Sequence, residues 1–138
     1  QAPSWLAAAG LLASANDPWG AQDAASLRSG VDASVFIIGD AAGRVSSQFG
    51  HYPKTAHVAA AMGIMVAAQI AGAGAAPAWP DSVCHLLTGV APDRGTRLEV
   101  AYRRRGDGFL MQEIRQQQEA DQLAAAAAWA AAHYAEFL

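Results

Sequence analysis

Apolar positions recur every three to four residues in two stretches of the first half of the chain. This spacing predicts a helix over residues 4–15 and a longer helix over residues 55–71, which is built largely of alanine and other small residues. Between them, residues 34–38 (Ser-Val-Phe-Ile-Ile) form a continuous apolar run, which is typical of a strand buried on both faces. The run ends at Gly39-Asp40, so the sequence predicts a buried strand with a Gly-Asp edge.

The second half of the chain has the two-residue period of strands. Residues 82–90 are strand-like, and residues 96–103 alternate apolar with charged side chains. The turn residues of 105–108 (Arg-Gly-Asp-Gly) predict a hairpin from which residues 109–114 return as a strand. An alanine-rich helix is expected over residues 119–137. Together these elements predict an α+β fold with a buried strand, a long alanine-rich helix, a small antiparallel β-meander and a C-terminal helix.

A proline-containing linker separates the two halves. Residues 75–81 hold Pro77 and Pro80, and they follow two glycines that would end the preceding helix. The sequence therefore predicts two domains, residues 1–76 and residues 77–138.

The composition excludes several classes of protein. Apolar residues make up 53% of the 138 residues and charged residues only 15%, against about 25% charged for an average domain, so the chain is too apolar to be intrinsically disordered. Its net charge of −3 lacks the basic footprint of a nucleic-acid binder, so no nucleic acid is expected as a partner. No membrane span is expected either, because the long apolar stretch 58–78 contains Gln69 and helix-ending glycines.

Metal and disulfide chemistry within the chain are also unexpected. Cys84 is the single cysteine, so the chain can form neither an internal disulfide nor a multi-cysteine zinc site. The four histidines have no metal-ligand spacing, so no metal site is predicted.

Three features can carry chemistry, and each has an ordinary alternative. Asp40, at the end of the predicted strand, can accept hydrogen bonds from sugar hydroxyls or be a turn residue with a capping carboxylate. Tyr52-Pro53-Lys54 opens the long helix, whose N-terminus can face an anion or simply begin after a proline, with Thr55 as a possible N-cap. Cys84 can be reactive or a small buried apolar residue.

The order of these features resembles one family. Residues 35–41, Pro53-Lys54 with its small-residue helix, and the stretch 84–103 resemble the C-terminal part of the flavin-binding subunit of flavocytochrome c sulfide dehydrogenase. This family belongs to the FAD-dependent pyridine nucleotide-disulfide oxidoreductases. The Gly39-Asp40 unit is shared by the whole superfamily, whereas the stretch 84–103 resembles the sulfide-dehydrogenase branch more specifically.

The resemblance implies a role for particular residues. Gly39 would let the backbone approach FAD, and Asp40 would hydrogen-bond its ribityl chain. The helix N-terminus at Lys54, Thr55 and Ala56 would face the pyrimidine side of the flavin, where its dipole stabilises negative charge on the reduced ring. By the same resemblance, Cys84 would form a redox-active disulfide with a cysteine far upstream, which hydrosulfide attacks before electrons pass through flavin to a haem subunit.

The same resemblance also implies an organisation and partners. Residues 1–76 would be the C-terminal segment of the FAD-binding domain, and residues 77–138 a cap or interface domain. The chain has no Gly-x-Gly-x-x-Gly fingerprint and no second cysteine, so FAD is expected only in the full-length protein and the isolated piece is expected to be inactive. The partners would be the N-terminal remainder of the polypeptide and a c-type cytochrome subunit, and the location would be the periplasm.

A second hypothesis comes from another class of function. The hairpin and the C-terminal helix would form a non-catalytic domain for dimerisation or for docking to a cytochrome, and Cys84 would only pack. Under the flavoenzyme hypothesis, Cys84 and the Asp40 edge should face one open cleft.

Overall fold

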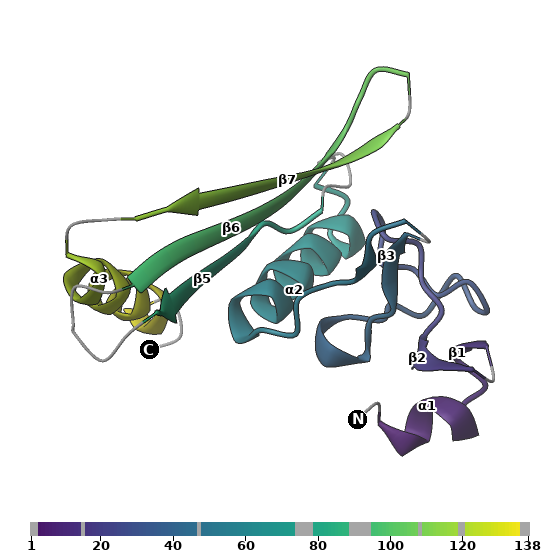
Figure 1. Cartoon of the computed structure of the whole chain (residues 1–138). Helices are drawn as coiled ribbons and strands as arrows, with labels where there is room; N and C mark the ends of the chain where they lie inside the picture. The colour runs from purple at the N-terminus through teal and green to yellow at the C-terminus, as the bar shows by residue number, and fades with distance from the viewer. Residues whose placement is uncertain are drawn as a thin grey trace. The chain divides into compact units, whose positions relative to one another are not determined.

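The chain forms two compact units, Gln1–Pro80 and Asp81–Leu138, which are here called the first and second units (Figure 1). The computed structural model describes residues 3–14, 16–46, 48–73, 79–88, 95–107, 109–118 and 121–135. The first unit holds α1 (Ser4–Ala8), β1 (Leu12–Ser14), β2 (Asp17–Gly20), η1 (Gly39–Ala41), β3 (Arg44–Ser46), β4 (Gly50–His51) and α2 (Ala56–Ile70). The second holds β5 (Ser82–Leu87), β6 (Gly95–Arg104), β7 (Leu110–Gln117) and α3 (Gln122–Ala135). This mixture of helices and small antiparallel sheets confirms the α+β class.

The predicted β-meander is present in the second unit. β5, β6 and β7 form one antiparallel sheet in that order, with Cys84 opposite Leu98 and Val100 opposite Ile114. The hairpin between β6 and β7 closes where Arg105 N–H donates to the Phe109 carbonyl (2.9 Å). The alternation of side chains that predicted these strands is therefore realised, although β7 continues three residues beyond the predicted end at residue 114.

The predicted C-terminal helix is also present. The backbone N–H of Ala124 donates to Asp121 Oδ1 (3.0 Å), which caps the N-terminus of α3. The helix packs on β6 through Gln122, and a Cβ added to Gly95 would lie only 2.7 Å from the Gln122 Cβ atom. Glycine at position 95 therefore allows the close approach of α3 to the sheet.

The long alanine-rich helix of the first unit is confirmed as α2. Its buried residues are Val58, Met62 and Val66, which recur every four residues on one face. Ile70, also expected on the apolar stripe, is exposed. η1 packs on this buried face, where the Gly39 N–H donates to Met62 Sδ (3.2 Å).

The predicted strand over residues 34–38 is wrong. In its place, Phe36 forms an isolated antiparallel bridge with Arg28, and the Ile37 N–H donates to the Leu27 carbonyl (2.9 Å). Ile38 is extended, and the chain then turns into η1 at Gly39. A strand buried in a parallel sheet needs hydrogen-bonding neighbours along its whole length, whereas the described part of the chain supplies one short bridge here, in which the Ser29 N–H also donates to the Val35 carbonyl (2.8 Å).

The first predicted helix is wrong over its second half. α1 ends at Ala8, and Gly10 has a φ of +69°, which ends a helix without steric strain. The chain then returns as the hairpin of β1 and β2, whose turn is held by the Ser14 Oγ atom accepting from Asp17 N–H (3.1 Å). β3 and β4 form a second antiparallel hairpin.

Several sequence predictions lie outside the described residues. These are the turn chemistry at 91–94, most of the linker before Trp79, Gly108 of the hairpin turn, and the first and last residues of the predicted C-terminal helix. None of the described helices is both long enough and apolar enough to cross a membrane.

Candidate functional site

The residues expected to bind a cofactor come together in the first unit. Gly39 and Asp40 lie in η1, which packs against α2, while Lys54 and Thr55 precede that helix and Ala56 is its first residue. Gly39 has a φ of +61°, and a Cβ added there would lie 3.3 Å from the Ala59 Cβ. Asp40 is exposed, so its carboxylate is accessible beside the first turns of α2. The positive φ and the close approach to α2 both favour glycine at position 39.

The N-terminus of α2 has no side-chain cap. Thr55 occupies the N-cap position with extended dihedral angles, but its hydroxyl makes no capping hydrogen bond, so the predicted capping role is wrong. Its Oγ1 atom is buried and has no hydrogen-bond partner among the described residues. The first turn of α2 also contains no acidic residue. The free N–H groups and partial positive charge of this helix end are therefore not neutralised by side chains of the helix itself.

Lys54 is bound within the first unit. Its ammonium donates to the Ala42 carbonyl and lies 4.4 Å from the centroid of the Trp19 ring, a cation–π contact. Burial lowers the pKa of Lys54, and the negative charges of Asp40 and Asp17 oppose that shift only in part. The side chain thus connects the start of α2 to the loop after η1, which argues against a fully solvated lysine.

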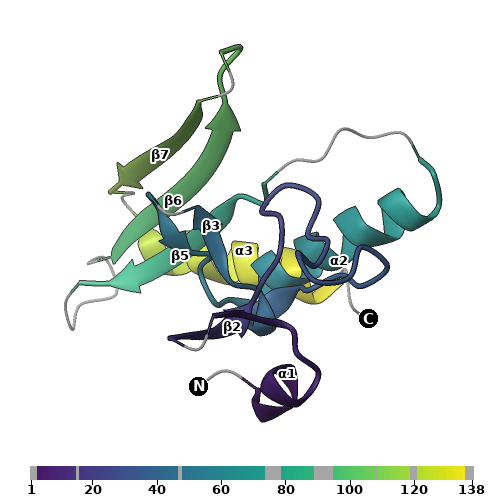
Figure 2. The same cartoon turned by 90° about the vertical axis from the view of Figure 1, so that its right-hand side faces the viewer.

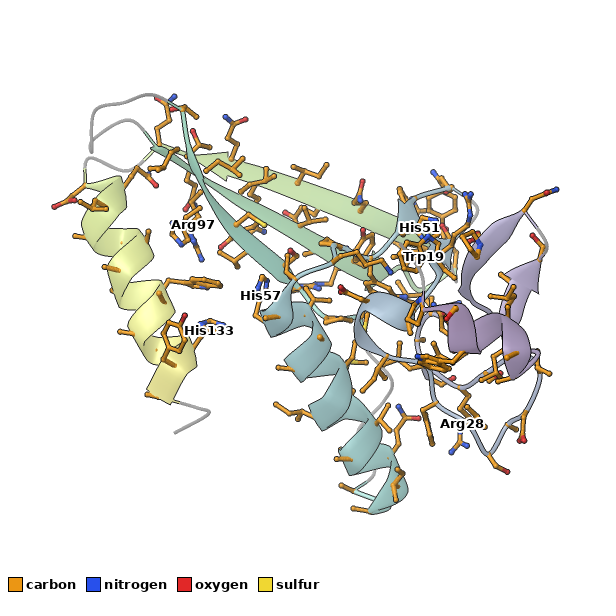
Figure 3. All side chains as sticks on the ribbon, turned by 90° about the horizontal axis from the view of Figure 1, so that it is seen from below. Trp19, Arg28, His51, His57, Arg97 and His133 are labelled. Atoms are coloured by element: carbon orange, nitrogen blue, oxygen red, sulfur yellow. The ribbon has the colours of Figure 1, made fainter. Side chains whose placement is uncertain are left out.

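Lys54 and four side chains near it form a polar and aromatic group that sequence analysis missed. We call it the Trp19 cluster: Asp17, Trp19, Arg44, His51 and Lys54. The rings of Trp19 and His51 meet edge to face at 5.8 Å (Figure 3), and Arg44 Nε lies 3.0 Å from Asp17 Oδ2. These residues come from β2, from the β3–β4 hairpin and from the start of α2, so no local spacing could have shown that they meet.

The charges of the Trp19 cluster act on one another. Burial alone would raise the pKa of Asp17, but hydrogen bonds from the Arg44 side chain and the Trp19 N–H outweigh it and hold that pKa below its ordinary value. His51 contributes in the same direction, and its Nδ1 atom is buried with no hydrogen-bond partner among the described residues. The cluster therefore anchors Lys54 by charge as well as by contact.

Cys84 belongs to the second unit. It lies in β5, half-buried, with its thiol free and Leu98 opposite it on β6. Its neighbour His85 points to the other face of the sheet, where its ring lies 5.6 Å from that of Trp129 on α3. The Trp129 ring in turn lies 4.3 Å from that of His133. Cys84 and His85 therefore form no dyad, which agrees with the alternation expected in a strand.

The second unit has a small polar cavity on the same face as His85. Its volume is about 110 Å³, well below the roughly 300–1,000 Å³ of small-molecule sites. The Arg103 guanidinium makes two hydrogen bonds to the Asp81 carboxylate (2.7 and 2.9 Å) at its edge, and Arg115 pairs with Glu113. The charges that line this cavity are thus already paired. Within the ranges that the structure describes, no three His, Cys, Asp or Glu side chains gather closely enough to hold a metal ion.

Lys54 is the only lysine in the chain, so its titration can be observed without overlap. We expect the Cε signal of isotopically labelled lysine in the folded protein to titrate below the ordinary lysine pKa of about 10.4, because burial disfavours the ammonium form. The same sample unfolded in urea is the control and should titrate at the ordinary value. Coinciding midpoints in the two states would contradict the burial of Lys54.

The same shift has a consequence for stability. Between the lowered pKa of folded Lys54 and the ordinary value, the unfolded chain binds more protons than the folded chain, so stability rises with pH in that window. The free energy of unfolding, measured in urea at several alkaline pH values, is expected to rise relative to that of the Lys54→Met variant. A constant difference between the two proteins across this window would argue against the linkage.

In the first unit, the Gly39-Asp40 edge therefore lies beside the N-terminus of α2, and no side-chain hydrogen bond caps that N-terminus. The Trp19 cluster holds this arrangement in place through Lys54. No protein-family model, curated protein or solved structure matches this chain.

Proposed function

We propose that this chain is the C-terminal portion of a flavin-dependent, sulfide-dehydrogenase-like oxidoreductase. In the full-length protein, electrons would move from a reduced sulfur compound through a disulfide of Cys84 and through FAD to a cytochrome c-type acceptor in the periplasm. The observation that carries the proposal is the placement of Gly39 and the exposed Asp40 beside the uncapped N-terminus of α2. The N-terminal remainder of the polypeptide would supply the rest of the cofactor site.

The residues of the first unit suit the middle part of FAD. The glycine at position 39 keeps the edge free of a side chain, and the Asp40 carboxylate can accept hydrogen bonds from the ribityl hydroxyls. The buried Thr55 Oγ1 lacks a partner among the described residues, and a polar atom of the ring edge would satisfy it. The dipole of α2, a helix of 15 residues, favours negative charge at its N-terminus. When bound, the flavin supplies two-electron redox chemistry.

The conformation before Gly39 also supports this proposal. Ile38 is extended and partly exposed, and the preceding Ile37 is buried. In an FAD-binding fold, this run would be a strand of a parallel sheet whose neighbours come from the N-terminal remainder. The apolar composition of residues 34–38 agrees with that arrangement.

Cys84 has the features that the sulfur chemistry requires. It is half-buried with a free thiol, and the proposed route requires that hydrosulfide reach its sulfur. Hydrosulfide would add to one sulfur of the disulfide, lose its proton and release the other sulfur as a thiolate. The persulfide would then bond to that thiolate sulfur to give a trisulfide, and the two electrons released as this bond forms would pass to the flavin.

The test uses the full-length gene product. We expect purified full-length protein to show the visible absorbance of oxidised flavin and Asp40→Ala to lower the bound flavin per protein at least severalfold. Asp32→Ala is the matched control, because Asp32 is an exposed carboxylate of the same unit whose Oδ1 accepts from Ser34 N–H (2.8 Å). A colourless full-length protein, with or without added FAD, would refute the proposal.

The role of Cys84 is tested separately. In the full-length protein, Cys84→Ser is expected to keep its flavin and to lose anaerobic bleaching of the flavin by sulfide, since the variant cannot form the disulfide. Dithionite should still bleach the flavin in the variant. If sulfide bleached both proteins at the same rate, the proposed route through Cys84 would be wrong.

A second candidate function keeps some support. Apolar side chains on β7, among them Met111 and Ile114, are exposed in the second unit, as a dimerisation or docking domain would require. Under this candidate the full-length protein would lack flavin, and Cys84→Ser would leave all its interactions unchanged.

A further inference from the structure

Among the described residues, no strand pairs with the outer edge of the sheet in the second unit. β7 lies at one side of the three-stranded sheet, with β6 as its neighbour among the described strands (Figures 1 and 2). Six of its eight residues are exposed, including Ile114 at 60%. An exposed edge strand of this length presents a row of backbone donors and acceptors that can pair with another strand.

The direction of these backbone groups follows from the hairpin. Arg105 N–H donates to the carbonyl of Phe109, its opposite residue, so this pair is a hydrogen-bonded one. Hydrogen-bonded pairs alternate along an antiparallel ladder, and the β6–β7 register continues without a shift. Glu113 and Arg115 therefore bond to β6. The residues between and beside them, Leu110, Gln112, Ile114 and Gln116, direct their N–H and C=O groups outward.

The side chains on this edge are arranged in a self-complementary order. Glu113 and Arg115 flank Ile114 and point to the same face, where Arg115 Nη2 lies 2.7 Å from Glu113 Oε1. We propose that β7 pairs with β7 of a second copy of this chain, antiparallel and around a two-fold axis at Ile114. Each Glu113 would then lie opposite Arg115 of the second copy, Ile114 opposite Ile114, and Gln112 opposite Gln116.

The outward backbone groups allow several registers with a two-fold axis, and the charges select this one among them. Ile114 has its N–H and C=O directed outward, so a two-fold axis there forms a hydrogen-bonded pair of Ile114 residues. The opposed charges then occupy non-hydrogen-bonded pairs, in which side chains approach most closely. A two-fold axis at Gln112 would place Glu113 opposite Met111, and an axis at Gln116 would place Arg115 opposite Gln117, so both lose the pairing of charges. Axes at Glu113 or Arg115 would also pair the outward backbone groups, but they would place two Glu113 or two Arg115 side chains opposite each other in the closest pairs.

The pairing extends the sheet from three strands to six across the two copies. The pairing involves only β7, so it does not depend on flavin binding. Its test is therefore independent of the test of the proposed oxidoreductase function. It also covers Met111 and Ile114, two of the apolar side chains that the second unit otherwise exposes on this strand.

The oligomeric state of the whole 138-residue chain tests the proposal. We expect sedimentation equilibrium to give a dimer whose dissociation constant rises at least tenfold in Glu113→Arg and in Arg115→Glu, because each places like charges opposite each other. The double variant Glu113→Arg with Arg115→Glu restores opposite charges and should restore the dimer. Exchanging Arg105 and Asp107, an ion pair at the hairpin tip, is the matched control and should change nothing.

A backbone variant tests the same edge independently of charge. Ile114→Pro removes an outward N–H and no hydrogen bond to β6, so it should yield a folded monomer by circular dichroism and sedimentation. The proposal is overturned if the wild-type chain is monomeric at every concentration measured, or if the single charge variants dimerise as strongly as the wild type. It is equally overturned if the double variant fails to regain the dimer lost in the single ones.

Discussion

Replacing Met62 with alanine is expected to destabilise the first unit by about 2–5 kcal/mol. Met62 is 1% exposed on the buried face of α2, and its sulfur accepts the Gly39 N–H at 3.2 Å. Truncation would leave a cavity between α2 and η1 and would remove the sulfur that accepts this N–H group. Because η1 carries the Gly39-Asp40 edge, the same variant should also loosen the proposed cofactor site.

The control for Met62 lies on the same helix. Ile64 is 69% exposed, so Ile64→Ala should change the free energy of unfolding by no more than about 0.5 kcal/mol. Urea unfolding, together with amide hydrogen exchange of α2, measures both variants. Equal effects at the two positions would show that η1 does not pack on α2 as described.

Replacing Gly43 with alanine is expected to destabilise the first unit by about 1–3 kcal/mol. The added Cβ would lie 2.4 Å from the Gly20 carbonyl oxygen and 3.2 Å from Gln22 Oε1, which accepts the Gly43 N–H at 2.7 Å. The Gly20 oxygen is a backbone atom, and Gly20 also forms a bridge with Ala42. Relief of the clash therefore requires β2 and the loop after η1 to separate.

At another glycine of the same unit, substitution by alanine is expected to raise the stability instead of lowering it. Gly63 lies inside α2, and a Cβ added there meets nothing within 4 Å. Gly63→Ala should therefore stabilise the protein by about 1 kcal/mol, because alanine is the better helix former. Thermal and urea unfolding of both variants would measure the contrast. If Gly43→Ala were as stable as the wild type, the close approach of β2 to position 43 would be wrong.

The elements of the second unit could be predicted because their signals are local. The alternation along β6 and the turn residues Arg105, Gly106 and Asp107 define a hairpin within some twenty residues of sequence. The position of α3 on the sheet was not predictable in the same way. It depends on the missing side chain at Gly95 and on the contact of His85 with Trp129, which are far apart along the chain.

In the first unit, by contrast, local signals predicted elements that do not form. Residues 34–38 have the composition of a buried strand, yet Phe36 finds only the Arg28 bridge among the described residues. Composition expresses a preference for burial, whereas a strand also requires neighbours that a single sequence segment does not contain. The helix predicted over residues 4–15 failed for a related reason, since the turn that Ser14 makes with Asp17 favoured a hairpin.

By itself the sequence determined the α+β class, the alanine-rich helix α2, the β-meander and the choice of Gly39, Asp40 and Lys54 as candidate site residues. These follow from periodicity, turn chemistry and short motifs, which act over a few neighbouring residues. Only the tertiary structure decided that Lys54 is held by Ala42 and Trp19, that Gly39 lies against α2, and that Glu113 and Arg115 flank an open edge. The first two are contacts between residues that are distant in sequence, and the third depends on which edge of a sheet is unpaired. Neither property produces a pattern among neighbouring residues from which it could be predicted.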